Sequence, residues 1–248
     1  DKAGDDPVVC LIKIKITNLG EAAENIVFPI RSLVDKTVES VYTEKGWVFA
    51  EGRRLRLLAA LSDGGTLCAE DGSVWVESEI LAGQSLAFYL KIPHIQLTLE
   101  QKQKLHGLEY EAERDKTAHF WRERLGQGTQ IITPNQTLNA FYRSHLMHML
   151  VVNDRLPGSD MNVARCGGFY YGSFPDEGCM AIQNLDRRGY HREAERCLEL
   201  YIRYQGTAPL PGNFSSQEGV FYGSGGYEFA GYNRNHGWVL WCLAEHYR

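Results

Sequence analysis

Apolar and polar residues alternate along the N-terminal part of the chain. Between Val9 and Thr17 the aliphatic residues alternate with Lys13 and Lys15, so an extended segment would have one apolar and one polar face. Further short β-like runs follow, separated by Asp-Gly and Gly-rich turn sequences. They are expected at Ile26–Ile30, Leu55–Leu61, Val74–Ile80 and Leu86–Ile92. Short strands at this spacing are typical of an antiparallel β-sandwich, which we predict for residues 1–97.

A helical pattern replaces this alternation from Thr98 onward. Thr98 precedes strong helix formers, and the pattern up to Leu125 predicts an amphipathic linker helix, broken near its middle, within residues 98–133. The next helix is expected to open at Thr133-Pro134-Asn135, with the proline in its first turn. Later helices are expected at 176–188, which ends at a C′ glycine, Gly189, and at 191–205 and 236–248. The chain is therefore expected to be a multidomain α+β protein, with helical hairpins at 134–248.

Composition and charge narrow the classes of partner. The 248 residues are 44% hydrophobic and 23% charged, which is typical of a globular protein with a sizeable core. The formal net charge of -5 argues against nucleic acid, and no apolar run approaches the roughly 20 residues that span a membrane. We therefore expect no nucleic-acid or membrane partner, while the oligomeric state stays open. Buried free thiols are expected at Cys179, Cys197 and Cys242.

Two aromatic-rich segments each precede a predicted helix. One leads into Asp176 and Glu177, and the other, within 214–232, leads into the last helix. A carboxylate can accept hydrogen bonds from two sugar hydroxyls, and an aromatic ring offers a flat apolar face to a pyranose. At one end of adjacent hairpins, these segments would line a cleft for a sugar. The residues expected to bind it are Arg165, Tyr170, Tyr171, Asn235, His236 and Trp238.

Simpler interpretations of the same residues remain open. Asp176 and Glu177 would stabilise the N-terminus of a helix by interacting with its dipole, whatever else they do. The aromatic residues could pack as ordinary loop residues. His145 and His148 are three residues apart on a helix, but no third ligand stands at an expected position, so we expect no metal site.

Several segments, taken in order, carry a resemblance to a known family. They are Leu81–Pro93, Phe120–Leu125 with Ile131–Asn139, Tyr170–Glu177 with Leu185–Ala194, and Asn235–Tyr247. In this order they resemble the six-hairpin glycosidases, which include glucoamylase-like, glycogen-debranching-like and α-L-rhamnosidase-like enzymes. The resemblance implies a β-sandwich followed by the start of an (α/α)6 barrel, with Asp176 gripping the sugar and Glu177 beside it. It also implies that the general acid and base lie beyond Arg248. Because the sequence has no start methionine, no clear beginning to its first domain and an end inside a predicted helix, we expect the chain to be a fragment at both ends.

The resulting hypothesis is a glycoside hydrolase, of the inverting type, acting on an oligo- or polysaccharide. One carboxylic acid would protonate the leaving oxygen while a second carboxylate activates water. Asp176 and Glu177 are the catalytic candidates, although adjacent helical residues diverge and do not readily form such a pair. No metal or organic cofactor is needed for this chemistry.

Two alternative functions remain open. In a polysaccharide lyase, Tyr170, Tyr171 or His236 would act as the base, and Arg165 would bind a uronate carboxylate. The third hypothesis is a non-catalytic carbohydrate-binding or structural module. Cleavage of a sugar would separate both enzymes from this module, and an unsaturated uronate product would identify the lyase.

Overall fold

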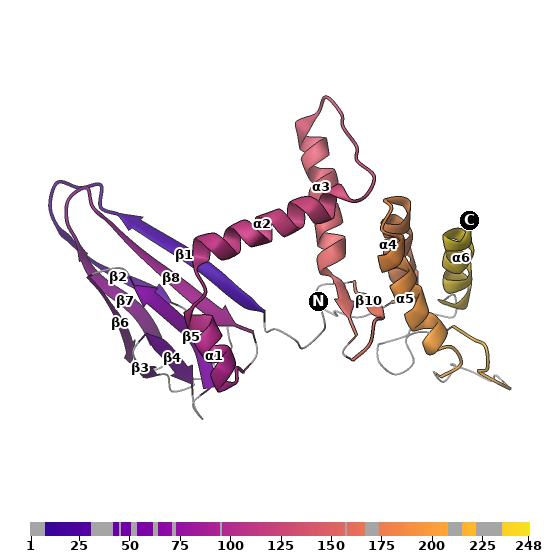
Figure 1. Ribbon diagram of the computed structural model, residues 1–248, viewed down its shortest axis with the longest axis horizontal. Coiled ribbons are helices and arrows are strands. Elements are labelled where there is room, and N and C mark those ends of the chain that lie inside the picture. Colours follow the sequence, from indigo (N-terminus) through magenta and orange to yellow (C-terminus); the bar gives the residue numbers. More distant parts are fainter. Residues whose placement is uncertain are drawn as a thin grey trace. The chain divides into compact units, whose positions relative to one another are not determined.

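The structure, a computed structural model of the 248-residue chain, is a mixed α+β protein with antiparallel sheets and helices (Figure 1). It describes residues 8–30, 42–44, 46–50, 54–61, 64–70, 73–94, 96–156, 158–166, 174–207, 215–221 and 235–248. The chain divides into two compact units, with residues 4–116 in one and residues 117–248 in the other. This boundary falls within the predicted linker region, and the finer three-part division stays a prediction.

The N-terminal unit contains two antiparallel sheets. The larger has the strand order β1-β8-β5-β4-β3 and the smaller β2-β7-β6. The strands are β1 (Val9–Thr17), β2 (Glu24–Ile30), β3 (Tyr42–Glu44), β4 (Trp47–Ala50), β5 (Arg54–Leu61), β6 (Gly65–Glu70), β7 (Ser73–Ile80) and β8 (Ser85–Pro93). The predicted strands correspond closely to β1, β2, β5, β7 and β8, whereas β3, β4 and β6 were not predicted.

Side chains from both sheets meet in one hydrophobic core. Alternate residues of β8, namely Leu86, Phe88 and Leu90, are buried there together with Val76 of β7. Phe28 of β2 packs edge to face against Phe88, with ring centroids 5.4 Å apart. The period-two pattern of the sequence therefore directs alternate side chains of these strands into a shared interior.

Helix α1 (Leu99–His106) packs through Leu105 against Leu58 of the larger sheet. Its start is the predicted cap: the Thr98 side chain accepts from the Gln101 backbone N–H, and the Gln101 side chain accepts from the Thr98 N–H. Leu58 neighbours Leu57, which faces the shared core, so the two leucines of β5 lie in different hydrophobic clusters. Because successive side chains of β5 point to opposite faces of the sheet, one face packs in the shared core and the other packs against α1.

A buried lysine joins β8 to the end of α1. The Nζ atom of Lys91 donates to the carbonyl oxygens of Leu105, His106 and Leu108, at 3.2, 2.8 and 2.6 Å. Lys91 is only 6% exposed, and burial lowers its pKa from the ordinary value. The carbonyls of Leu105 and His106 belong to the last turn of the helix, where a cation also suits the helix dipole, and that of Leu108 lies just beyond the Gly107 cap.

Helix α2 (Tyr110–Gly126) follows the expected break but is not amphipathic, so that part of the prediction was wrong. Among the described residues it has no buried side chain. Its charged residues instead pair along its own surface, as in the ion pair between Lys116 and Glu113 at 2.7 Å. Near its start, Glu111 pairs with Lys13 of β1 at 2.5 Å. The charges that suggested a polar face are therefore distributed around the whole helix.

The C-terminal unit is mainly helical. Its elements are α3 (Gln136–Val151), β9 (Asn153–Arg155), β10 (Asn162–Ala164), α4 (Pro175–Arg187), α5 (His191–Arg203) and α6 (Asn235–Tyr247). The expected start of α3 needs correction, because Asn135 is the N-cap and Pro134 therefore precedes the cap instead of lying in the first turn. The Asn135 side chain accepts from the Leu138 N–H at 3.1 Å, which fixes this boundary.

Helices α4 and α5 form the predicted short hairpin. At the end of α4, Gly189 has a positive φ of 85° and donates to the Asp186 carbonyl, while Tyr190 donates to the Leu185 carbonyl. This is a Schellman motif, and Leu185 and Tyr190 pack in the same cluster as it requires. The predicted C′ glycine is confirmed.

Helix α6 packs beside α4 and runs in the same direction. Gln183 donates to the Cys242 carbonyl at 3.2 Å, and one turn further on Asp186 is bonded to His246 at 2.8 Å. Both pairs are separated by nearly the same number of residues, 59 and 60, as parallel helices require. The three thiols predicted to be buried, those of Cys179, Cys197 and Cys242, are free and lie in this core, as predicted.

Candidate functional site

The parallel packing of α4 and α6 places their N-terminal ends together. Because contacts between the helices join residues about 60 positions apart, Asp176 lies at the level of the first turn of α6. Asn235 and His236 occupy that turn. Arg165 directly follows Ala164 of β10, whose carbonyl oxygen would lie 3.5 Å from a Cβ added to Gly178 of α4. Four of the residues predicted to bind sugar or catalyse its cleavage therefore gather at one end of this helix pair.

Asp176 and Glu177 lie in different environments. Asp176 is 3% exposed, and its Oδ1 accepts from the backbone N–H of Glu177 at 3.2 Å. Glu177 is exposed. The two carboxyl groups thus do not face a common point, in keeping with the divergence of adjacent residues on a helix. The Asp176 contact also satisfies one of the free N–H groups of the first helical turn.

Arg165 and His236 are held by neighbouring groups. The Nε atom of Arg165 donates to the Asp154 carboxylate at 2.7 Å. The Nδ1 atom of His236 accepts from the Phe221 backbone N–H at 3.1 Å, and the two rings stack with centroids 5.7 Å apart. With Nδ1 acting as an acceptor, a neutral His236 carries its proton on Nε2, where it can donate to a ligand.

The remaining predicted sugar-binding residues differ in placement. Asn235 is fully buried at the start of α6. Trp238 is partly buried against the helical core and packs edge to face on Trp241, with centroids 5.4 Å apart. Tyr170 and Tyr171 lie outside the described residues, so their predicted place in the cleft stays a prediction.

One face of α4 extends from Asp176 along the helix. Residues at positions i, i+4, i+7, i+8 and i+11 from Asp176 share this face of an α-helix. They are Met180, Gln183, Asn184 and Arg187. Met180 is 53% exposed although α4 is otherwise a core helix. Arg187 is also exposed, whereas Gln183 is buried, so this face is only partly open to solvent beyond its first turn.

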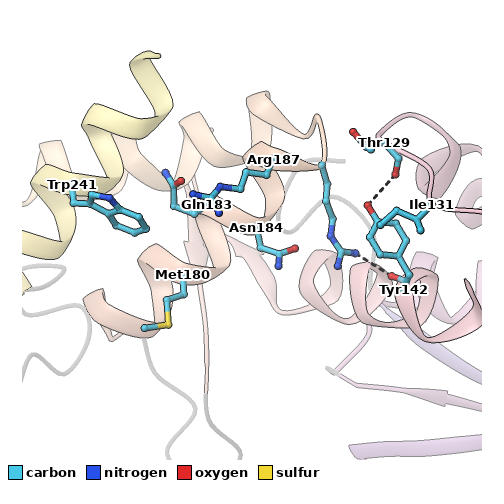
Figure 2. Close-up of a pocket in the computed structure, with 9 residues that line it drawn as sticks. Thr129, Ile131, Tyr142, Met180, Gln183, Asn184, Arg187 and Trp241 are labelled. Atoms are coloured by element: carbon cyan, nitrogen blue, oxygen red, sulfur yellow. Dashed lines mark hydrogen bonds between the residues drawn. The ribbon is translucent and has the colours of Figure 1, made fainter. Parts of the chain in front are cut away.

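A groove of about 430 Å³, hereafter the α4 groove, lies over this face (Figure 2). Its walls come from α3, α4, α6 and the segment before α3. It is lined by Thr129, Ile131, Tyr142, Met180, Gln183, Asn184, Arg187, Arg188 and Trp241. Its volume falls within the range of small-molecule sites, roughly 300–1,000 Å³.

The wall of the α4 groove formed by Tyr142 and Arg188 is fixed by several interactions. The Arg188 guanidinium lies 4.0 Å from the Tyr142 ring centroid and donates to the Tyr142 carbonyl at 3.0 Å. The Tyr142 hydroxyl donates to the Thr129 carbonyl at 3.1 Å, a contact drawn in Figure 2. This wall is accordingly preorganised, which lowers the entropic cost of binding a ligand.

The opposite part of the groove offers aromatic and polar groups. Trp241 is 39% exposed. Asn184 has its Oδ1 atom enclosed, with no hydrogen-bond partner among the residues that the structure describes. A buried acceptor without a partner gains from a donor, and a ligand hydroxyl would reach this one once the Asn184 side chain turns toward the groove, since less than 1 Å² of the Oδ1 atom is accessible. The groove therefore combines a ring for stacking with unused hydrogen-bonding capacity.

Sequence reasoning did not identify the α4 groove, because its walls come from segments far apart in the chain. A partial signal was present in α4. The stripe of Met180, Asn184 and Arg187 is only partly apolar, whereas the opposite face carries the core residues Ile182 and Leu185. A helix that needs only one buried face leaves the other face available for a ligand.

None of the helices in the described ranges is both long and apolar enough to cross a membrane. In the same part of the chain, no three His, Cys, Asp or Glu side chains are grouped so that they could hold a metal ion.

Comparison with protein-family models and with curated proteins found no match to this chain. The site must therefore be judged from its own geometry and chemistry.

Proposed function

We propose that this chain is the carbohydrate-binding part of a glycoside hydrolase of the six-hairpin type. In this proposal the two sheets of the N-terminal unit form a β-sandwich, and α3 to α6 belong to an (α/α) barrel. The sugar lies along the face of α4 that carries Asp176 and the α4 groove. The substrate is an oligo- or polysaccharide.

The directions of the helices support this architecture. Helices α4 and α6 are adjacent and parallel, and α5 connects them by running back in the opposite direction. A double-layered helical barrel repeats this arrangement, with parallel inner helices joined through antiparallel outer ones. The shared core of the two sheets, with Phe28 packed on Phe88, similarly supports a sandwich.

One observation carries the functional proposal: a single face of α4 aligns Asp176 with an aromatic and amide-lined groove. Trp241 would stack on the apolar face of a pyranose, and the Asn184 amide, turned toward the groove, would accept from one of its hydroxyls. His236, with Nε2 as the donor, would contact sugar at the N-terminal end of the helix pair. Such a combination of ring faces and amides is what a neutral, hydroxyl-rich ligand requires.

The geometry needed for glycoside cleavage excludes Asp176 and Glu177 as the catalytic pair. Two carboxyl groups must flank the scissile bond, about 6.5–9.5 Å apart for inversion. Asp176 is buried and Glu177 is exposed on a different side of the helix, so these two do not form that pair. We assign Asp176 to holding the sugar, and the acid and base would come from other residues.

Calorimetric titration of the chain with neutral and acidic oligosaccharides tests the proposal. We expect weak binding that is reduced about tenfold or more in Trp241→Ala, since burying a large apolar side chain is worth roughly 1.5–3 kcal/mol. Trp121→Ala is the matched control, because Trp121 packs on Phe120 of α2 and does not line the groove.

Product analysis separates the proposal from its alternatives. Hydrolysis to new reducing ends supports the glycosidase assignment, and an unsaturated uronate product would instead identify a lyase. Binding with no cleavage by any longer form of the protein would identify a non-catalytic module. Failure to bind any saccharide would refute carbohydrate recognition altogether.

A further inference from the structure

We propose that the α4 groove selects sugars that carry a carboxylate, and that Arg187 is the residue that pairs with it. This inference rests on the proposed function and specifies its substrate class. The first observation is the charge of the groove. Its nine lining residues include two arginines and no aspartate or glutamate. The chain as a whole has a net charge of -5, so this local positive character is not a general property of its surface.

The two arginines differ in how much of their hydrogen-bonding capacity is used. Arg188 stacks on Tyr142, donates to its carbonyl oxygen and lies 3.4 Å from His145. The Arg187 side chain is 70% exposed, and its ion pair with Glu245 is long, at 3.9 Å. A guanidinium with weakly used donors is suited to bidentate pairing with a ligand carboxylate.

The groups around Arg187 match the rest of a sugar acid. Asn184 lies one turn before Arg187 on α4, about 4.5 Å along the helix axis, and lines the same groove, where a turn of its amide would bring the enclosed Oδ1 to a ligand hydroxyl. Trp241 of α6 lines the same groove and offers its ring face (Figure 2). A uronate residue supplies all three complements at once: a carboxylate, hydroxyl donors and an apolar ring face.

An inorganic or nucleotide phosphate fits the groove less well. Phosphate sites usually use several backbone N–H groups at a helix N-terminus or in a Gly-rich loop. The α4 groove instead lies along the middle and C-terminal part of α4. Acidic peptides share the carboxylate but lack the ring and its hydroxyls, so they serve as competitors in the test.

The experiment compares two oligosaccharides of equal length, an oligogalacturonate and the neutral galactose oligomer, by titration calorimetry on the full chain. We expect the acidic oligomer to bind at least tenfold more tightly, and this preference to vanish in Arg187→Gln. Arg187→Lys should retain only part of the preference, since lysine keeps the charge but loses the planar fork. Arg203→Gln, an exposed arginine on α5, is the control and should leave the preference unchanged.

The outcomes separate this inference from the proposed function. Equal binding of the neutral and acidic oligomers overturns the carboxylate preference and leaves carbohydrate recognition standing. Binding of neither oligomer overturns both. Binding of a glutamate-rich peptide as tightly as the oligogalacturonate overturns the assignment to sugars. A preference that survives in Arg187→Gln but disappears in Arg165→Gln would place the sugar carboxylate at the N-terminal end of the helix pair. That result would overturn the assignment of Arg187.

Discussion

Replacing Lys91 with methionine should loosen α1 from the larger sheet of the N-terminal unit. Methionine keeps most of the apolar stem but removes the ammonium group that bridges to three carbonyl oxygens. Two of these oxygens lie in the last turn of α1 and that of Leu108 just after its Gly107 cap, so no further turn of this helix supplies donors. Water reaches this region poorly, because Lys91 is 6% exposed and Leu105 is 2% exposed.

The loss of stability in Lys91→Met can be estimated from the three hydrogen bonds that the ammonium group makes. The Leu105 carbonyl also accepts from the Leu108 N–H, so its loss is partly compensated. The carbonyls of His106 and Leu108 lose a charge-assisted bond, each worth about 1.5–3 kcal/mol. Removing the cost of burying an ammonium group offsets part of this loss. We therefore expect a decrease of about 2–4 kcal/mol in the free energy of unfolding of this unit, a large share of the roughly 5–15 kcal/mol of a typical domain.

Urea unfolding combined with hydrogen exchange of the α1 amides measures this effect. The control is Lys104→Met, because Lys104 is exposed and pairs only with Glu100, one turn away on α1; its loss should change stability little. A Lys91→Met variant as stable as this control, with α1 amides still protected, would refute the reasoning.

The same lysine predicts a dependence on pH. Burial lowers the pKa of Lys91 in the folded state below the ordinary lysine value of 10.5. Between the lowered pKa and 10.5, the unfolded chain binds more protons than the folded one, so this group makes stability rise with pH. We expect the difference in stability between wild type and Lys91→Met to widen as pH increases through this window. A constant or narrowing difference would contradict the assignment.

Three further predictions concern the helical unit. Gly128→Ala should lower the free energy of unfolding by about 1–3 kcal/mol or more through overpacking, because its Cβ would lie 2.2 Å from the Arg188 carbonyl oxygen. Gly126→Ala is the control, since its Cβ would meet nothing within 4 Å. Thermal unfolding compares the two variants. Asp186→Asn should cost about 1.5–3 kcal/mol, because its carboxylate bonds two histidines, one from α5 and one from α6; an unchanged melting temperature would contradict this. In a thiol titration, the exposed Cys10 should react quickly, whereas the three buried thiols should react only on unfolding. Burial blocks access of the reagent to them, and it also raises the pKa of Cys197, which lowers the fraction of reactive thiolate. Rapid reaction of Cys197 in the folded protein would contradict this.

Local sequence signals predicted much of the secondary structure. The alternation around Lys13 and Lys15 indicated β1, and Thr98 with Gln101 indicated the start of α1. Gly189 indicated the end of α4. Each of these features depends on residues a few positions apart, so a short stretch of sequence is enough to predict it. The short strands β3 and β4 carried no such signal, because β4 is placed by pairing with β5, and β3 by pairing with β4.

The features that depend on tertiary contacts were not predictable in this way. Nothing in the sequence around Lys91 indicates that a charged residue of β8 is buried, yet it is, because its ammonium group bonds to the carbonyls at the end of α1. The charges of α2 suggested one polar face, but no side chain of α2 is buried. The α4 groove needs Tyr142, Asn184 and Trp241 from three helices, whose distances no local pattern sets. Conversely, the shared end of α4 and α6 was expected from hairpin geometry, and the structure places Asp176 and His236 there.

The most direct test of the central claim follows the indole N–H signals of the chain by NMR during titration with an oligosaccharide. The sequence contains five tryptophans, so each signal can be assigned with single substitutions. If sugar binds along α4, the signal of Trp241 should shift with saturation, with a smaller shift for its neighbour Trp238. The signal of Trp75, whose indole donates to Glu77 on β7, should stay fixed. A Trp241 signal that does not move while any saccharide binds would contradict the account.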